Sequence, residues 1–353
     1  VTGVQTCALP ISEFLFFDTF NVLSIILKIS FLNFFMVNYF LKLIIISFFL
    51  FFLFLKYNIA ENNQILLNEI LPGILLYYGE NEEPNNINKG AIANKVAIIG
   101  NKSILVYDAG PSKEFAERFI KELRKYSKKP IKYLVISHRH FDHAYGIEVY
   151  IKKKVTIFID KTEYSYLKKE GPLINNLLIK NLGFNEDNIN FDNISEEKIN
   201  FLADSIEVNL GNRRVLIKNL GIAHTKGDLI AYDFNTNTYI TGDVIFIGRA
   251  AAFSDANIPM WINVINNKLD LSWDYLIPGH GSIINNKLEL NDTKNWLYFL
   301  DNAAKQAVSE GDMISEIFQY PIPKEIHHLK MKSITLRQGI KKQLDLYRKK
   351  YIE

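Results

Sequence analysis

The amino-acid sequence predicts an α/β fold of four layers, in which two β-sheets pack face to face and helices cover them in the order αββα. Two observations support this prediction. Short apolar segments in the first half alternate with an amphipathic helix, as expected for a sheet with one helix-covered face. The second half again contains paired apolar segments followed by a helix, although its sequence does not repeat the first. Two β-rich halves with outer helices would form this sandwich.

The strands expected in the first half surround one helix. They are residues 73–78, 95–99, 104–107, 131–136 and 155–159. The second and third form a hairpin, because Gly100 and Asn101 provide a two-residue turn between them. Ser112 is expected to cap a helix whose apolar residues recur at helical spacing, and Pro130 ends it.

The second half is expected to contain two further hairpins and a long helix. Its strands are residues 206–209, 214–218, 229–233, 238–240 and 274–277. A capped helix is expected from Asp292 to Glu310, with Gly311 as its stop. We expect one domain over residues 61–290, with residues 291–353 as its C-terminal helical extension.

The composition suits a globular protein and excludes several classes of function. The chain has 353 residues, of which 48% are hydrophobic and 22% charged, which is ample material for a core. The formal net charge of +3 is too near neutral to indicate a nucleic-acid partner. The single cysteine, Cys7, excludes a disulfide framework and a cysteine-rich zinc site.

The first 35 residues are expected not to belong to the native protein. Residues 1–11, VTGVQTCALPI, are identified as the in-frame translation of a sequencing adapter. Residues 12–35 are expected to be non-native upstream translation, because Met36 has the character of a genuine start. Cys7 would then be artificial, and the native protein would contain no cysteine.

Residues 36–60 indicate either a cleaved signal peptide or an uncleaved N-terminal anchor. Their apolar run, residues 43–55, has the length of a signal-peptide core and is short for a membrane span. A buried core helix is the third alternative, but the run has no polar face. We therefore expect an exported protein, periplasmic or secreted, that touches a membrane only through this segment if it is not cleaved.

Four potential metal ligands lie within six residues, directly after a predicted strand: His138, His140, Asp142 and His143. Histidine nitrogen and carboxylate oxygen are both common zinc ligands. Alternate residues of an extended loop share one side, so the first three can converge while Arg139 points away. His143 extends the cluster towards a second metal. The alternative is a polar surface loop with hydrogen-bonded histidines.

Three more candidates lie in strand-ending loops further along the chain. His224 and His280 are flanked by glycines, and Asp243 follows a predicted strand directly. Loops at strand ends commonly carry functional residues. His327 and His328 are adjacent on a predicted helix and do not face one point, which favours surface or packing roles.

In this order, the motifs resemble those of the metallo-β-lactamase superfamily. They are HxHxDH at residues 138–143, AHTxGD at 223–228, GD at 242–243 and PGHG at 278–281. The resemblance covers residues 66–285 and implies the four-layer αββα metallo-β-lactamase sandwich. Residues 243–281 look most like the exported zinc hydrolases of quinoprotein relay systems. The segment 246–249 (FIGR), the Asp255 loop and Trp261 carry that similarity.

The resemblance implies a site with two Zn²⁺ ions, iron being possible. His138, His140 and His224 would hold one ion, and Asp142, His143 and His280 the other, with Asp243 bridging both. The activity implied is hydrolysis of an ester, thioester, lactone or amide carbonyl of a small molecule by metal-activated water. Asp142 would be catalytic and orient the nucleophile. The site contains no cysteine, unlike the best-known β-lactamases, and looks more like that of glyoxalase II.

Two further carboxylates are expected around the ligands. Asp108 ends a neighbouring strand and either supports the cluster loop or is a simple turn residue. Asp228 either holds His224 or caps a turn. The loops at residues 79–90 and 250–259 either border the substrate cleft or only connect elements.

Two other functions remain open from the sequence. A mononuclear iron persulfide dioxygenase would use a similar cluster. A non-catalytic accessory of a quinoprotein oxidation system would bind the quinoprotein or its cofactor. A nuclease of the same fold is disfavoured, because the near-neutral charge and the export segment argue against nucleic acid.

Overall fold

The computed structural model describes residues 12–61, 65–185 and 188–352. The chain divides into two compact units, residues 1–64 and residues 65–353. The adapter sequence predicted at residues 1–11, with Cys7, lies outside the described residues. The second unit carries all of the sheets and the remaining helices, so it is the part that positions a site.

The first unit consists of one continuous helix, α1 (Ser12–Glu61). Within it, residues Asn21–Phe52 have a mean hydropathy of 2.1, and the side chains of its apolar window are exposed. By length and composition this segment could cross a membrane, and a signal sequence has the same properties. The apolar helix begins well before the run predicted at residues 43–55, because residues 21–42 are also mostly apolar.

Two sheets form the centre of the second unit. The first sheet has the strand order β1 to β7, antiparallel from β1 to β4 and parallel from β4 to β7. Its strands are β1 (Asn68–Leu71), β2 (Ile74–Tyr77), β3 (Lys95–Ile99), β4 (Ile104–Tyr107), β5 (Ile131–Val135), β6 (Thr156–Ile159) and β7 (Ile199–Phe201). The second sheet has the order β12-β11-β10-β9-β8 and is antiparallel except for β11 and β12. Its strands are β8 (Ser205–Asn209), β9 (Arg214–Asn219), β10 (Leu229–Asp233), β11 (Thr238–Ile240) and β12 (Tyr275–Ile277).

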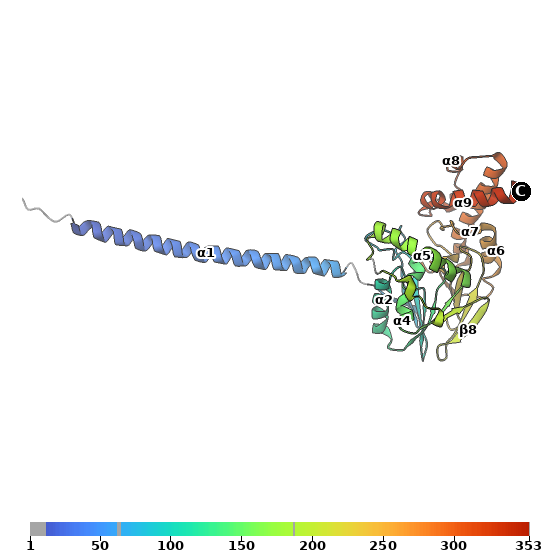
Figure 1. The fold of residues 1–353 in the computed structure, drawn as a ribbon, viewed down its shortest axis with the longest axis horizontal. Coiled ribbons are helices and arrows are strands. Elements are labelled where there is room, and N and C mark those ends of the chain that lie inside the picture. Colours follow the sequence, from blue (N-terminus) through green and yellow to red (C-terminus); the bar gives the residue numbers. More distant parts are fainter. Residues whose placement is uncertain (1–11, 62–64, 186–187, 353) are drawn as a thin grey trace, which may run out of the picture. The chain divides into compact units, whose positions relative to one another are not determined.

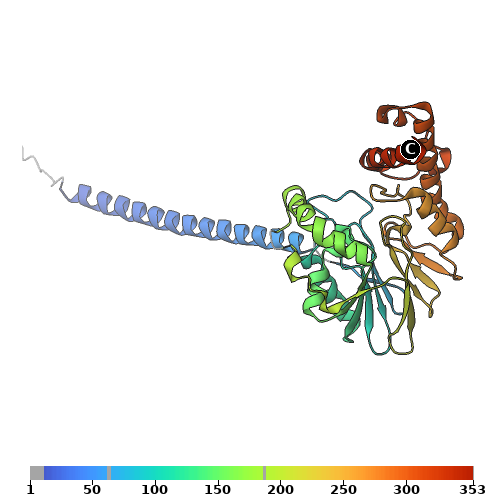
Figure 2. The same ribbon diagram turned by 45° about the vertical axis from the view of Figure 1, so that its right-hand side comes forward.

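Helices cover the outer face of each sheet (Figures 1 and 2). The first sheet is covered by α2 (Lys113–Tyr126), α4 (Ile147–Lys152) and α5 (Lys161–Leu182). The second is covered by α6 (Ile258–Asn267) and α7 (Asn291–Glu310), and α9 (Lys332–Ile352) packs against α7. In sequence, the short helix α3 (Phe141–Ala144) lies between α2 and α4, and the short helix α8 (Ile314–Ile317) lies between α7 and α9. The predicted C-terminal helices therefore pack on the same unit as the sheets.

Three apolar clusters separate the four layers. In β2, Leu75 belongs to the cluster under the first helical layer, whereas Leu76 belongs to the cluster between the sheets. In β10, Ala231 faces the first sheet and Ile230 faces the second helical layer. This alternation follows from the two-residue repeat of a strand. The predicted αββα sandwich is confirmed, because the central strands of both sheets, such as β4 and β10, are buried on both faces.

Local sequence patterns predicted most of the helices and strands, and the elements that they missed have identifiable causes. The β3–β4 and β8–β9 hairpins form as predicted, and the Ser112 hydroxyl caps α2 by accepting a hydrogen bond from the backbone. The long helix α5 was not predicted, because Gly171 and Pro172 interrupt its pattern. Gly171 is required there, since a Cβ atom would lie 2.2 Å from the ring of Phe191.

A buried ion pair joins the two sheets at one end of the sandwich. The guanidinium of Arg213 donates to both carboxylate oxygens of Asp233, each at 2.8 Å. It also donates to the carbonyl oxygens of Pro72, between β1 and β2, and of Ile99, the last residue of β3, at 2.9 and 3.1 Å. Both charged side chains are buried, so neither can replace its partner with water.

We expect Arg213→Ala to lower the free energy of unfolding by about 3–5 kcal/mol, because the substitution leaves the Asp233 carboxylate buried and unpaired. Urea unfolding followed by tryptophan fluorescence would measure this. The control is Arg214→Ala at the next position, whose pair with Glu207 is exposed and should contribute less than about 1 kcal/mol. Equal effects of the two substitutions would contradict the structural role of the buried pair.

Candidate metal centre

The seven candidate ligands come together at one edge of the sandwich, where several strands end. His138 follows β5, Asp243 follows β11 and His280 follows β12. His224 lies in the loop after β9, and β9, β11 and β12 all run in the same direction. Their carboxyl ends therefore meet at the same edge. Asn94 joins this edge to the first sheet, because its side chain donates to the carbonyl oxygens of Pro278 and Gly281.

The first group of side chains contains His138, His140, His224 and Asp243. The Nδ1 atom of His140 lies 3.0 Å from His138 Nε2 and 3.1 Å from His224 Nε2. Oδ2 of Asp243 lies 3.3 Å from His224 Nε2 and 3.8 Å from His138 Nε2. Three ring nitrogens and one carboxylate oxygen thus converge on a single point.

The second group contains Asp142, His143 and His280. Nε2 of His143 and of His280 lie 3.5 and 3.4 Å from Oδ2 of Asp142. The same two nitrogens lie 3.1 and 3.3 Å from Oδ1 of Asp243. Asp243 therefore presents one oxygen to each group. Gly279 permits this approach, because a Cβ atom there would lie 2.1 Å from Asp243 Oδ1.

The outer ring nitrogen of every histidine in the cluster has a partner. Nδ1 of His224 and of His280 can donate to the backbone carbonyl oxygens of Ala252 and Ile92, at 3.0 and 2.9 Å. The remaining partners are Ser137 Oγ for His138, Asp255 for His140 and Asp108 for His143. Such contacts fix the ring orientation and the tautomer of a metal-ligating histidine. The inner nitrogens therefore carry the lone pairs that face the centre.

Asp108 joins the cluster loop to the neighbouring strand. Its carboxylate accepts hydrogen bonds from the backbone N–H and the hydroxyl of Ser137, at 2.8 and 3.0 Å. Oδ2 also lies 2.7 Å from His143 Nδ1. Asp108 has a backbone φ of 65°, which few residues other than glycine adopt. The backbone conformation is thus the one that aims this carboxylate at the cluster.

The electrostatics of the centre favour a positive charge. Burial opposes protonation of His143, but Asp243, Asp142 and Asp108 raise its pKa to about 10. Burial also opposes ionisation of Asp142, yet His143 and His280 hold its pKa below the ordinary value. Burial lowers the pKa of His224 to about 3, although the charge of Asp243 opposes the shift. A cation between the carboxylates and the neutral rings satisfies all of these groups.

Two orphaned atoms show that the residues fit a metal ion. Among the described residues, His143 Nε2 and Asp243 Oδ1 are buried without a hydrogen-bond partner, although they lie 3.1 Å apart. An unsatisfied buried polar atom normally costs about 1–3 kcal/mol, so two at one point require a ligand. Imidazole nitrogen and carboxylate oxygen together suit zinc or iron.

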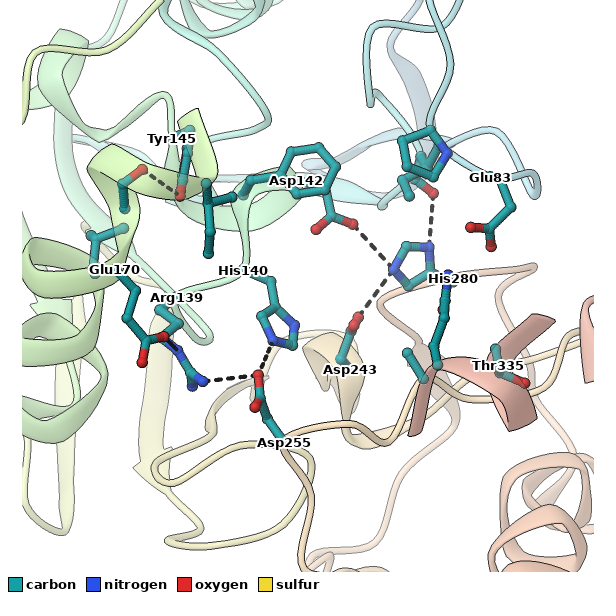
Figure 3. Close-up of a pocket in the computed structure, with 18 of the residues that line it drawn as sticks. Glu83, Arg139, His140, Asp142, Tyr145, Glu170, Asp243, Asp255, His280 and Thr335 are labelled. Carbon is teal, nitrogen blue, oxygen red and sulfur yellow. Dashed lines mark hydrogen bonds and ion pairs between the residues drawn. The ribbon is translucent and has the colours of Figure 1, made fainter. Parts of the chain in front are cut away.

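A cavity of about 280 Å³ opens over the cluster (Figure 3). His140, Asp142, Asp243 and His280 form part of its lining. The other walls come from both loops that the sequence singled out, from α5 and from α9. Representative residues are Glu83 and Pro84, Ala252 and Asp255, Tyr166 and Glu170, and Thr335 and Gln338. The sequence contained no signal that α9 would reach this cavity.

Two arginines lie at the cavity in ways that sequence reasoning missed. The side chain of Arg139 points away from the histidine cluster, as expected. It nevertheless lines the cavity and pairs with Glu163 and Asp255, at 3.0 and 2.8 Å. Arg249 is buried and donates to the carbonyl oxygen of Glu82 at 3.3 Å. Its Nε has no hydrogen-bond partner among the described residues.

The structure places Asp228 at a turn. Its carboxylate accepts hydrogen bonds from the backbone N–H and the hydroxyl of Thr225, at 2.9 and 2.8 Å. No hydrogen bond or ion pair between Asp228 and His224 is present in the described part of the chain. Of the two sequence-based alternatives, the geometry is that of the turn cap.

Comparison with known proteins places the fold. The model of the Metallo-beta-lactamase superfamily matches residues 91–298. The fold is similar to that of a metallo-beta-lactamase from Pontibacter korlensis, with a TM-score of 0.53, 15% identity, and coverage of 67% of this chain and 99% of that one. It is also similar to DIM-1 metallo-beta-lactamase (TM-score 0.51, 16% identity, coverage 67% and 97%). At these identities the likeness concerns the fold.

One curated relative matches a shorter segment. A linear primary-alkylsulfatase from a Pseudomonas species is 27% identical over 89 residues. That segment is 24% of this chain and 17% of the relative, so the chain spans only a small part of the relative's length.

We expect Asp228→Asn to remove a pH-dependent part of the stability. Burial raises the pKa of Asp228 to about 7, although hydrogen bonds from Thr225 oppose the shift. The folded protein therefore keeps a proton that the unfolded chain releases, and stability falls as the pH rises from about 4 to about 7. The asparagine cannot ionise, so the Tm of the variant should rise relative to the wild type over this range. Thermal unfolding after metal removal would measure it, and a Tm difference independent of pH would contradict it.

Proposed function

The chain belongs to the metallo-beta-lactamase superfamily and is a metal-dependent hydrolase, and from this premise we propose that its site holds two zinc ions and hydrolyses a small-molecule carbonyl compound. The substrate classes are esters, thioesters, lactones and amides. The observation that carries the proposal is the position of Asp243, whose two oxygens face two separate groups of ligands. One shared carboxylate between two groups is suited to a pair of ions.

The residues divide between the two proposed ions as the distances indicate. His138, His140 and His224 would hold the first. Asp142, His143 and His280 would hold the second, and Asp243 would contribute to both. Bound zinc lowers the pKa of a coordinated water to about 7 and so supplies a nucleophile at neutral pH.

The chain's own residues orient the reactants around these ligands. Asp142 borders the cavity, and its carboxylate would hold and orient the attacking water. Its pKa is held below the ordinary value by His143 and His280 against the opposing effect of burial, so it is ionised and ready to accept a hydrogen bond. The aromatic wall formed by Tyr145, Tyr166 and Phe246 excludes water from the apolar part of a substrate.

The subfamily resemblance also has a structural counterpart. Phe246 stacks on the ring of His280 with 5.1 Å between centroids, and Trp261 meets His224 edge-on at 5.1 Å. Asp255 contacts His140. We propose on these grounds that the chain is most similar in function to the exported hydrolases of quinoprotein relay systems. The apolar helix α1 supports export, as a signal peptide or as an anchor.

We expect His140→Ala to abolish metal-dependent turnover while the chain stays folded, because His140 is a partly exposed ligand at the rim of the cluster. The assay is turnover of an ester, thioester, lactone, amide and primary alkyl sulfate panel, with bound metal measured in parallel. Chelation should abolish turnover and zinc should restore it. The control, His328→Ala, removes an exposed histidine paired with Asp292 and should change neither property.

Two results of the same measurements would contradict the proposal. Retained turnover in His140→Ala would exclude the assigned site. Mainly iron in the purified protein, together with oxygen uptake, would instead support the mononuclear iron dioxygenase. A non-catalytic accessory would show no turnover in the wild type and would tolerate replacement of Asp142.

We further propose that Arg249 binds an anionic group of the substrate. The guanidinium is buried in the cavity wall, its Nε is unpartnered among the described residues, and the carboxylate of Glu83 is 3.7 Å from its terminal nitrogen. Arg249→Met should raise KM for an anionic substrate about tenfold, since a hydrogen bond to a charged group contributes about 1.5–3 kcal/mol. KM for the matching neutral ester is the control. An equal rise for both substrates would contradict an anion-binding role.

A further inference from the structure

The C-terminal helix α9 lies beyond the segment that matches the superfamily, which ends at residue 298. It nevertheless contributes Thr335 and Gln338 to the wall of the cavity. We propose that α9 positions the first group of metal ligands by holding the loop at residues 250–257, here called the clamp loop. This inference rests on the proposed metal site.

The clamp loop orients two of the three histidines in the first group. Oδ2 of Asp255 lies 3.0 Å from the outer nitrogen of His140. The carbonyl oxygen of Ala252 lies 3.0 Å from the outer nitrogen of His224. If the loop moved, both rings would lose the contact that sets their direction, and the two nitrogens facing the centre would move apart.

The clamp loop is in turn held by α9. The buried side-chain amide of Gln343 donates to the carbonyl oxygens of Phe253 and Ala256, at 3.1 and 2.9 Å. The preceding residue of the helix, Lys342, places its ammonium 2.6 Å from Oδ1 of Asp255. These bonds fix the loop backbone on both sides of Asp255 and also fix the Asp255 carboxylate itself.

Close packing adds to these polar contacts. At Gly339 of α9, a Cβ atom would lie 2.6 Å from the ring of Phe253, so the helix backbone rests directly against the clamp loop. On the opposite side, the guanidinium of Arg139 lies 2.8 Å from Oδ2 of Asp255. Asp255 is thereby held between the cluster loop and the C-terminal helix (Figure 3 shows the Arg139, His140 and Asp255 side of this arrangement).

The second group of ligands has different supports. The outer nitrogen of His143 contacts Asp108, and that of His280 contacts the carbonyl oxygen of Ile92. Neither partner lies in the clamp loop or in α9. The influence of α9 should therefore fall on one of the two proposed ions, which distinguishes a positioning role from general support of the fold.

The experiment uses the full chain in detergent, with zinc affinity measured by competition with a chromophoric chelator. Lys342→Met removes the charge opposite Asp255, and Lys342→Arg retains it. Gln343→Leu removes the two amide hydrogen bonds at similar volume. Lys341→Met is the matched control, because Lys341 is an exposed lysine on the same turn that makes no ion pair in the described structure. Hydrogen exchange of the clamp loop and the spectrum of bound Co²⁺ are recorded for each protein.

We expect Lys342→Met and Gln343→Leu to weaken binding of one zinc ion by about tenfold, the lower end of the range found when a direct partner of a metal ligand is removed, because both residues act through the clamp loop and not on a ligand itself. The other ion, the Lys341→Met control and Lys342→Arg should stay within about twofold of the wild type. Faster exchange in the clamp loop and an altered Co²⁺ spectrum should accompany the loss. Zinc affinities within twofold of the wild type in both variants would overturn the proposal.

Different results would refute the proposed metal site and the proposed role of α9. A wild-type chain that binds no zinc would refute the proposed metal site, whatever the variants do. If the wild type binds two ions and Lys342→Met binds both as tightly as the wild type does, only the role of α9 is refuted. Because Lys342 is at the surface, this variant tests the proposal even if Gln343→Leu fails to fold.

Discussion

The Asp243 carboxylate, buried between two clusters of imidazole rings, is the constraint on which the rest of the site depends. Its two oxygens face different groups of ligands, and one of them lacks a hydrogen-bond partner among the described residues. A buried carboxylate of this kind is stable only beside positive charge. The same requirement raises the pKa of neighbouring His143 to about 10, against the effect of burial. The centre therefore favours positive charge, which follows from its charges before any reaction is considered.

The sandwich satisfies this constraint because it brings the ends of several strands together and excludes water from the space between them. β5 delivers the HxHxDH loop from the first sheet, whereas β9, β11 and β12 deliver His224, Asp243 and His280 from the second. Each inward-facing ring is then fixed by a partner on its outer nitrogen. Three of those partners, Ser137, Asp108 and Ile92, belong to the first half of the chain, and the other two lie in the clamp loop. The geometry of the cluster thus depends on two sets of contacts. The inner set holds the imidazole rings, and the outer set, which holds the clamp loop, extends to α9.

Prediction from the sequence succeeded where a local pattern carried the information. The hairpins, the cap of α2 and the alternation of buried residues follow from turn residues and periodicity over a few positions. The cluster could be found because four ligand-type residues lie within six positions. Asp255, Arg249 and Gln343 could not be found in this way. Each is a single polar residue whose importance comes from a partner distant in sequence, and no spacing rule marks such a residue.

The sequence by itself determined the four-layer fold and which histidines and carboxylates are suited to bind metal, because periodicity and ligand chemistry are local properties. Only the tertiary structure decided that Arg139 lines the cavity and that Asp228 caps a turn. It also decided that the last helix of the chain reaches the site through Lys342 and Gln343. These outcomes depend on the packing of segments far apart in the chain, where hydrogen bonds and ion pairs of 2.6–3.3 Å form only once the layers are assembled.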